Sequence, residues 1–135
     1  MLRAWAIQAF LNPPELELIR THLKGDGENR AVIFLGDNVY PRGLPNQTSS
    51  LWSQAHESLS AQLELVKNFP GKIFFIPGNR DWANGGKEGL EYVKNQRRYI
   101  EDFLQRKNIF LPKKGKPGPV EIDLTDDIEL IIIDS

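Results

Sequence analysis

Apolar residues occur along this chain in two alternating patterns, short continuous runs and longer stretches with helical spacing. Continuous runs predict buried strands at 31–35 and 72–76, and a terminal hairpin from 120–124 and 128–134. Helical spacing predicts helices from about residue 13 up to Gly25, from 51 to 66 and from 90 to about 107. Helices that alternate with continuous apolar strands, followed by a hairpin, indicate a layered α/β domain with at least two parallel strands.

Each of the first two predicted strands leads into a loop of glycine and polar residues. The first loop starts as "GDNVYPRGLP" at Gly36 and extends over fifteen residues, which is longer than most connections in a compact domain. The second loop contains "GNRDW" from Gly78 to Trp82. Because parallel strands bring their carboxyl ends to one edge of a sheet, we expect the two loops to face a common crevice.

Asp37 and Asn79 are the candidate metal ligands in these loops. Gly36 and Gly78 permit backbone angles and close approaches that a side chain would obstruct, so each loop delivers a short oxygen-bearing side chain directly after a rigid strand. Carboxylate and amide oxygens suit a hard or borderline divalent metal ion. The alternative is a plain strand-to-loop turn, because glycine, aspartate and asparagine are the ordinary turn residues; Asn38 fits either interpretation.

Composition and charge exclude several kinds of fold and binding partner. The chain has 135 residues, no cysteine and a formal net charge of -1, so a disulfide framework and thiolate metal ligands are excluded. Near-neutral charge gives no general attraction to nucleic acid, and we predict no nucleic-acid partner. The apolar N-terminal run is too short to span a bilayer, and no membrane segment or compartment is predicted.

The two loop motifs resemble those of the calcineurin-like metallophosphoesterases. "GDNVY" and "GNRDW" lie about forty residues apart, each after an apolar strand, and the similarity extends through "GLEYVKNQRRYI" and "ELIIIDS". It is strongest with a bacterial, purple acid phosphatase-like branch. The resemblance covers residues 12–135, a partial domain, and leaves residues 1–11 as an unmatched N-terminal segment.

Several expectations follow from this resemblance alone. It implies a four-layered α/β/β/α sandwich with two divalent or trivalent metal ions of the Mn, Fe or Zn type, and a phosphoester substrate. Asp37 would bridge both metals, Asn79 would bind one, and Tyr40 is a candidate third ligand, as in the purple acid phosphatase members. Such a centre clamps a phosphoryl group and activates a water molecule.

The sequence departs from the family pattern in two ways. Arg80 replaces the histidine that contacts phosphate, and an arginine grips phosphate but does not donate a proton at neutral pH. The upstream Asp-x-His and downstream Gly-His-x-His motifs do not occur, and His22 and His56 fall in predicted helices. We therefore expect a domain truncated at both ends, in which turnover is impaired. The alternative is a catalytically inactive module that binds phosphate or a partner.

Three further interpretations concern single residues and one strand. Asp81 is expected to orient its motif loop as a positioning group, or else to cap the turn. Trp82, Tyr92 and Tyr99 are interpreted as packing residues rather than substrate platforms. Residues 131–133 are expected to need cover from a layer outside this chain, so self-association through the exposed last strand is predicted.

Overall fold

The computed structural model describes residues 1–7, 13–25, 29–113 and 118–133, which form a mixed α/β fold. A three-stranded parallel sheet has the order β1-β2-β3, and an antiparallel pair is formed by β4 and β5. The elements in chain order are β1 (Arg3–Ile7), α1 (Pro13–Leu23), β2 (Arg30–Phe34), α2 (Trp52–Val66), β3 (Lys72–Phe75), the 3-10 turn η1 (Ala83–Gly85), α3 (Gly89–Leu104), β4 (Val120–Thr125) and β5 (Ile128–Ile132).

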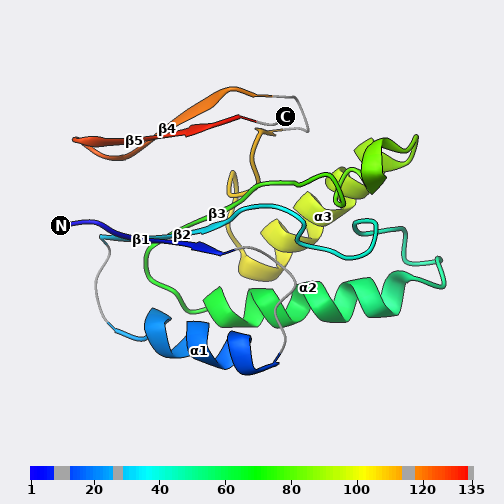
Figure 1. Cartoon of the computed structure of the whole chain (residues 1–135), viewed down its shortest axis with the longest axis horizontal. Coiled ribbons are helices and arrows are strands. Elements are labelled where there is room, and N and C mark those ends of the chain that lie inside the picture. Colours follow the sequence, from blue (N-terminus) through cyan, green and yellow to red (C-terminus); the bar gives the residue numbers. More distant parts are fainter. Residues whose placement is uncertain (8–12, 26–28, 114–117, 134–135) are drawn as a thin grey trace.

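The parallel sheet is centred on β2 (Figure 1). Its register pairs Arg3 with Arg30 on one side and Ala31 with Lys72 on the other. Beyond β3, the Phe75 nitrogen donates to the Ile109 carbonyl at 2.7 Å, which continues the edge with the segment after α3. The prediction of at least two parallel strands is confirmed, whereas β1 is a strand that the apolar pattern did not predict.

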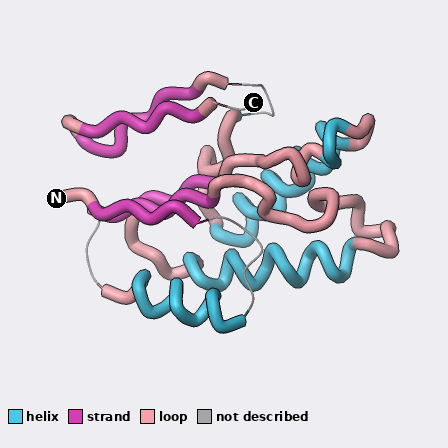
Figure 2. The backbone as a smooth tube through the Cα atoms, viewed as in Figure 1, coloured by secondary structure: helices cyan, strands magenta, loops and turns pink. Residues whose placement is uncertain are grey.

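The two faces of the sheet are buried by different partners. Val32, Phe34, Ile73 and Phe75 belong to one apolar core with residues of all three helices. The alternate positions Ile33 and Phe74 belong to a second core with residues of the hairpin. Figure 2 shows the same order, with helices on one side of the sheet and the β4–β5 pair on the other. Burial on both faces explains why these strands are apolar at nearly every position.

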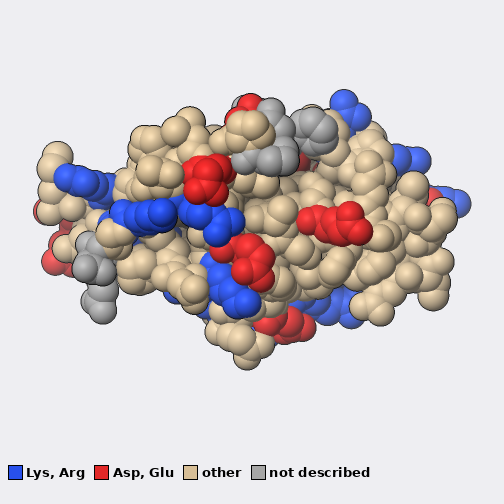
Figure 3. Space-filling view, turned by 90° about the horizontal axis from the view of Figure 1, so that it is seen from below, with Lys and Arg blue, Asp and Glu red and all other residues tan. Residues whose placement is uncertain are grey.

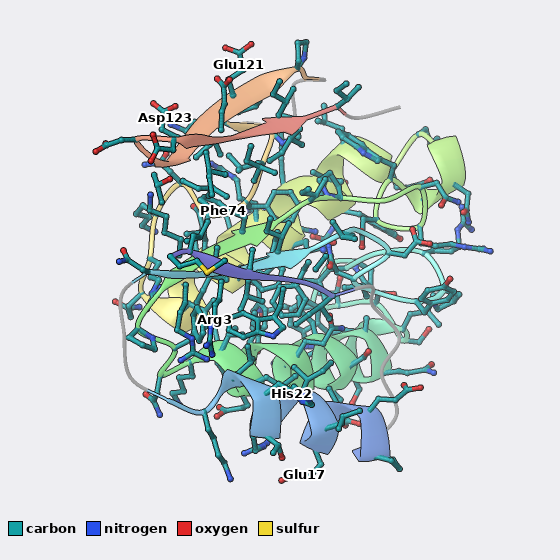
Figure 4. All side chains as sticks on the ribbon, turned by 60° about the vertical axis from the view of Figure 1, so that its left-hand side comes forward. Arg3, Glu17, His22, Phe74, Glu121 and Asp123 are labelled. Atoms are coloured by element: carbon teal, nitrogen blue, oxygen red, sulfur yellow. The ribbon has the colours of Figure 1, made fainter. Side chains whose placement is uncertain are left out.

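Lys72, on β3, forms hydrogen bonds that link the hairpin to the parallel sheet. Its ammonium donates to the carbonyl of Asp123 at 3.1 Å and to that of Leu124 at 2.6 Å. Glu121 and Asp123 point away from the sheet, whereas Phe74 lies between the two layers (Figure 4). The hairpin therefore presents an acidic outer face and an apolar inner face.

The expectation that residues 131–133 lack cover is wrong for the middle residue. Ile132 is buried in the second core against the parallel sheet. Ile131 and Ile133 alternate with it and are 55% and 73% exposed. Self-association through this strand stays a prediction, and residues 134–135 lie outside the described residues.

Arg30 joins α1 to the sheet. Its guanidinium donates to the carbonyl oxygens of Leu23 at 2.8 Å, the last residue of α1, and of Gly25 at 2.6 Å, just beyond it. The same group lies 4.9 Å from the ring centroids of both Trp5 and Phe69. Carbonyls that the helix leaves unpaired are thus satisfied by a buried cation held between two aromatic rings.

Charges of both signs are interspersed on the face seen from below, the side on which α1 and α2 lie (Figure 3). Two exposed pairs on these helices, Arg20–Glu17 and Lys67–Glu64, contribute little to stability. No described helix is long and apolar enough to cross a membrane.

Candidate functional site

The loops that follow β2 and β3 meet in direct backbone contact. A Cβ atom on Gly36 would lie 2.7 Å from the Gly78 nitrogen, and one on Gly78 would lie 2.3 Å from Asp37 Oδ1. Gly36 also has a φ of 98°, a conformation that side-chain-bearing residues rarely adopt. The prediction that both loops lie at one edge of the sheet is confirmed, and this close approach explains the two glycines. The crevice between the loops stays a prediction.

Asp37 lies at the point of contact. Its backbone has a φ of 52°, in the left-handed region that aspartate and asparagine tolerate better than most residues. Its Oδ1 accepts a hydrogen bond from the Arg80 backbone nitrogen at 3.1 Å, and the Tyr40 hydroxyl lies 3.5 Å from Oδ2. Asp37 is half-buried, and the hydrogen bond from Arg80 fixes its carboxylate against the opposite loop.

Asp81 links the same two loops through hydrogen bonds to backbone amides of both. It is fully buried; Oδ2 accepts hydrogen bonds from the nitrogens of Gly78 at 2.8 Å and Asn38 at 3.1 Å, and Oδ1 accepts one from Val39 at 3.1 Å. Burial raises the pKa of Asp81 from 3.8 to about 6, opposed by these amide bonds and assisted by the Asp37 carboxylate. These contacts join the two loops and also cap the turn at Gly78, and a positioning role for Asp81 stays a prediction.

Asn38 and Gln62 form a supporting pair. Asn38 is buried, and its amide donates to the Ile76 carbonyl at 2.8 Å. Gln62, buried on α2, donates to the Asn38 carbonyl at 2.8 Å. Sequence reasoning missed Gln62, although one signal was available: a polar residue interrupts the apolar face that contains Leu59, Leu63 and Val66.

Three further predicted site residues come from the same loops. Asn79 is exposed, and its Nδ2 donates to Asn84 Oδ1 at 3.1 Å, so its own Oδ1 is the oxygen that suits a cation. The Arg80 guanidinium carbon lies 5.4 Å from the centroid of the Tyr40 ring. A cation, a phenol and a carboxylate are therefore neighbours at one edge of the sheet.

The donor set fits part of the coordination shell of one hard cation. Asp37, Asn79 and Tyr40 offer a carboxylate, an amide oxygen and a phenol oxygen, the ligand types that oxygen-preferring metals take. Within the described parts of the chain, no group of three or more histidine, aspartate or glutamate side chains is gathered where it could hold a metal ion. A two-ion centre is not assembled from these residues.

Both histidines lie in helices, as predicted. His22 is exposed on α1, with Nδ1 2.8 Å from the Leu18 carbonyl. His56 is half-buried on α2, with Nε2 2.8 Å from the Tyr99 hydroxyl. Their contacts lie in the helical layer rather than in the loops after β2 and β3.

Comparisons with protein-family models, with curated proteins and with solved structures find no match for this chain. Any functional assignment therefore depends on the two loop motifs and on the chemistry of the crevice between them.

Proposed function

We propose that this chain is a metallophosphoesterase-type domain, and that its crevice binds an oxygen-preferring divalent cation together with the phosphoryl group of a phosphoester. The contact between Asp37 Oδ1 and the Arg80 amide supports this most directly, because it presents one carboxylate and one guanidinium from two loops locked together. The resemblance of "GDNVY" and "GNRDW" to the motifs of that family adds to it. A sheet with helices on one face and a hairpin on the other is compatible with an α/β/β/α sandwich.

Each crevice residue has a distinct role in this proposal. Asp37 and Asn79 supply oxygen ligands, Tyr40 is a candidate third ligand, and Arg80 holds the phosphate through its planar fork of donors. When bound, a divalent cation polarises a phosphoryl oxygen and lowers the pKa of a bound water molecule. Asp81 keeps both loops in place through three backbone amides.

Turnover is expected to be slow. Arg80 stays protonated at neutral pH, so it stabilises phosphate charge without donating a proton to a leaving group. The same property favours the second candidate function, a catalytically inactive module that binds phosphate or a phosphorylated partner in this crevice. A two-ion centre, as the family resemblance implies, would need ligands in addition to the described ones.

The cation site is tested by calorimetric titration of Mn²⁺ into the wild-type chain and the Asp37→Asn variant. Asparagine tolerates the left-handed backbone and keeps an oxygen for the Arg80 amide, so the fold should persist while the anionic ligand is lost. We expect at least a tenfold loss of affinity. Asp123→Asn, at an exposed carboxylate on the hairpin, is the matched control and should bind as the wild type does.

Equal affinity in wild type and Asp37→Asn would refute the assignment, as would an equal loss in Asp123→Asn. The two candidate functions are separated by Arg80→His, assayed with p-nitrophenyl phosphate and Mn²⁺. A faster hydrolysis rate than wild type supports an impaired hydrolase. An unchanged rate with retained phosphate binding supports the binding module.

A further inference from the structure

A hollow lies outside the candidate site, between the end of the long loop and the helices α2 and α3. Its volume is about 620 Å³, within the range of pockets that hold small ligands. Its lining includes two aromatic rings, three side-chain amides, the hydroxyls of Thr48 and Tyr99, and one charge of each sign. The lining residues used below are Asn46, Gln47, Trp52, Asn95, Arg98, Tyr99 and Asp102.

The aromatic wall of this pocket is fixed in place. Trp52 stacks on His56 with ring centroids 5.3 Å apart and meets Tyr99 edge-on at 6.2 Å. The Tyr99 hydroxyl lies 2.8 Å from both Ser60 Oγ and His56 Nε2. Rings held by packing and hydrogen bonds present a preorganised surface, which lowers the entropic cost of stacking a planar ligand on one of them while the other meets it edge-on. Tyr99 thus packs against the core, as predicted, and also lines a cavity.

The polar rim is also ordered by contacts between the loop and α3. Asn95 Nδ2 lies 3.4 Å from the Leu44 carbonyl and 3.3 Å from Asn46 Oδ1, and Asn46 donates to Glu91. Arg98 donates through Nη2 to Asn95 Oδ1 at 2.6 Å. Arg98 Nε also lies 3.4 Å from the Lys94 carbonyl, and within the described parts of the chain Nη1 is left for an anion.

We propose that this pocket is a binding site for a free nucleoside monophosphate. Trp52 or Tyr99 suits a planar base, and the Gln47 amide matches the donors and acceptors on base edges, whereas the Asn46 and Asn95 amides bond within the protein and order the rim. Asp102, one turn beyond Arg98, pairs with Lys107 Nζ through Oδ1 at 3.1 Å and suits a ribose hydroxyl through its second oxygen, and Arg98 suits the phosphate. The site is independent of the proposed cation crevice, because it shares no residue with it.

The test is a calorimetric titration of the full chain with AMP, GMP, CMP and UMP in buffer that contains EDTA. We expect saturable binding of at least one nucleotide at one site. Trp52→Leu, which keeps an apolar contact with the core but lacks a ring, should weaken binding at least tenfold. Gln47→Ala, at an exposed rim position, should weaken it at least threefold without affecting folding. Asp37→Asn should bind with wild-type affinity.

Arg98→Ala separates the phosphate contact from the base contact. It should weaken binding of the nucleotide at least fivefold and leave the affinity for the matching nucleoside unchanged. The proposal is overturned if none of the four nucleotides binds saturably, or if Trp52→Leu and Gln47→Ala both bind as the wild type does. Loss of nucleotide binding in Asp37→Asn would also overturn it, because the nucleotide would then occupy the crevice. Mn²⁺ binding is measured separately, so failure of one site does not imply failure of the other.

Discussion

The backbones of Gly36 and Gly78 touch across the candidate crevice, so that a Cβ atom on either residue would overlap the opposite loop. Side-chain hydrogen bonds alone would tolerate small shifts of the loops, whereas contact between two backbones leaves little freedom. The positions of the Asp37 and Asn79 oxygens are therefore determined by how closely the loops approach one another.

Gly36→Ala is predicted to destabilise the protein more than Gly85→Ala does. Both glycines have positive φ values, 98° and 76°, but a Cβ on Gly85 would meet nothing within 4 Å. Gly85→Ala should therefore cost about 1–2 kcal/mol of unfolding free energy, from backbone strain alone. Gly36→Ala should cost about 1–3 kcal/mol more, because its methyl group displaces the Gly78 backbone. Urea denaturation measures both values, and equal losses would contradict the role given to the contact.

The stability of the chain is predicted to fall as pH rises from about 4 to about 6. Asp81 has a folded pKa of about 6, above the unfolded value of 3.8, so the native state binds more protons than the unfolded state in this window. Unfolding free energy then decreases with pH, by on the order of 3 kcal/mol in total, and levels off above the folded pKa. Chemical denaturation at a series of pH values measures this slope.

Asp81→Asn is the control for that experiment. The variant cannot titrate at this position, so it should lose the Asp81 part of the slope, although its stability is also shifted at every pH by altered hydrogen bonds. Identical slopes in the wild type and the variant would show that Asp81 has an ordinary pKa in the folded state.

Gln62→Leu is predicted to weaken the crevice from the helix beneath it. The substitution leaves the buried Asn38 carbonyl without the Gln62 amide, which should cost about 1–3 kcal/mol. It should also lower Mn²⁺ affinity, because the Asn38 backbone positions the loop that carries Asp37. Gln54→Leu, at an exposed position on the same helix, should change neither quantity. Wild-type stability and Mn²⁺ affinity in Gln62→Leu would show that Gln62 does not support the site.

Most of the fold could be predicted because burial leaves a clear apolar pattern. The strands β2 and β3 are continuously apolar because both faces of the sheet are buried, and α2 and α3 show helical apolar spacing because one face of each is buried. The strand β1 does not, because it lies at the edge of the sheet, and exposed Ala4 and Ala6 flank the half-buried Trp5. Alanine has little preference for strands, so such a segment gives a weak signal.

The sequence alone did not predict where α3 ends or which residues support the candidate site. The predicted helix extends to about residue 107, but α3 ends at Leu104, where Gln105 adopts a left-handed φ of 53°. The meeting of the Asp37 and Arg80 loops follows from parallel strand topology alone. By contrast, Gln62 bonds to Asn38 and Arg30 lies between Trp5 and Phe69, all remote in sequence, and neither spacing nor composition indicates those contacts.

The hydrogen bonds among Ser60, Tyr99 and His56, which support the aromatic wall, can run in only one direction. Ser60 Oγ donates to the His56 carbonyl at 2.7 Å, and a carbonyl can only accept, so the serine hydrogen is used there. Tyr99 must then donate its own hydrogen to Ser60 and accept from His56 Nε2. Neutral histidine protonated on Nε2 and fully charged histidine both satisfy this circuit. The ring that supports Trp52 therefore keeps the same partners whether His56 is neutral or charged.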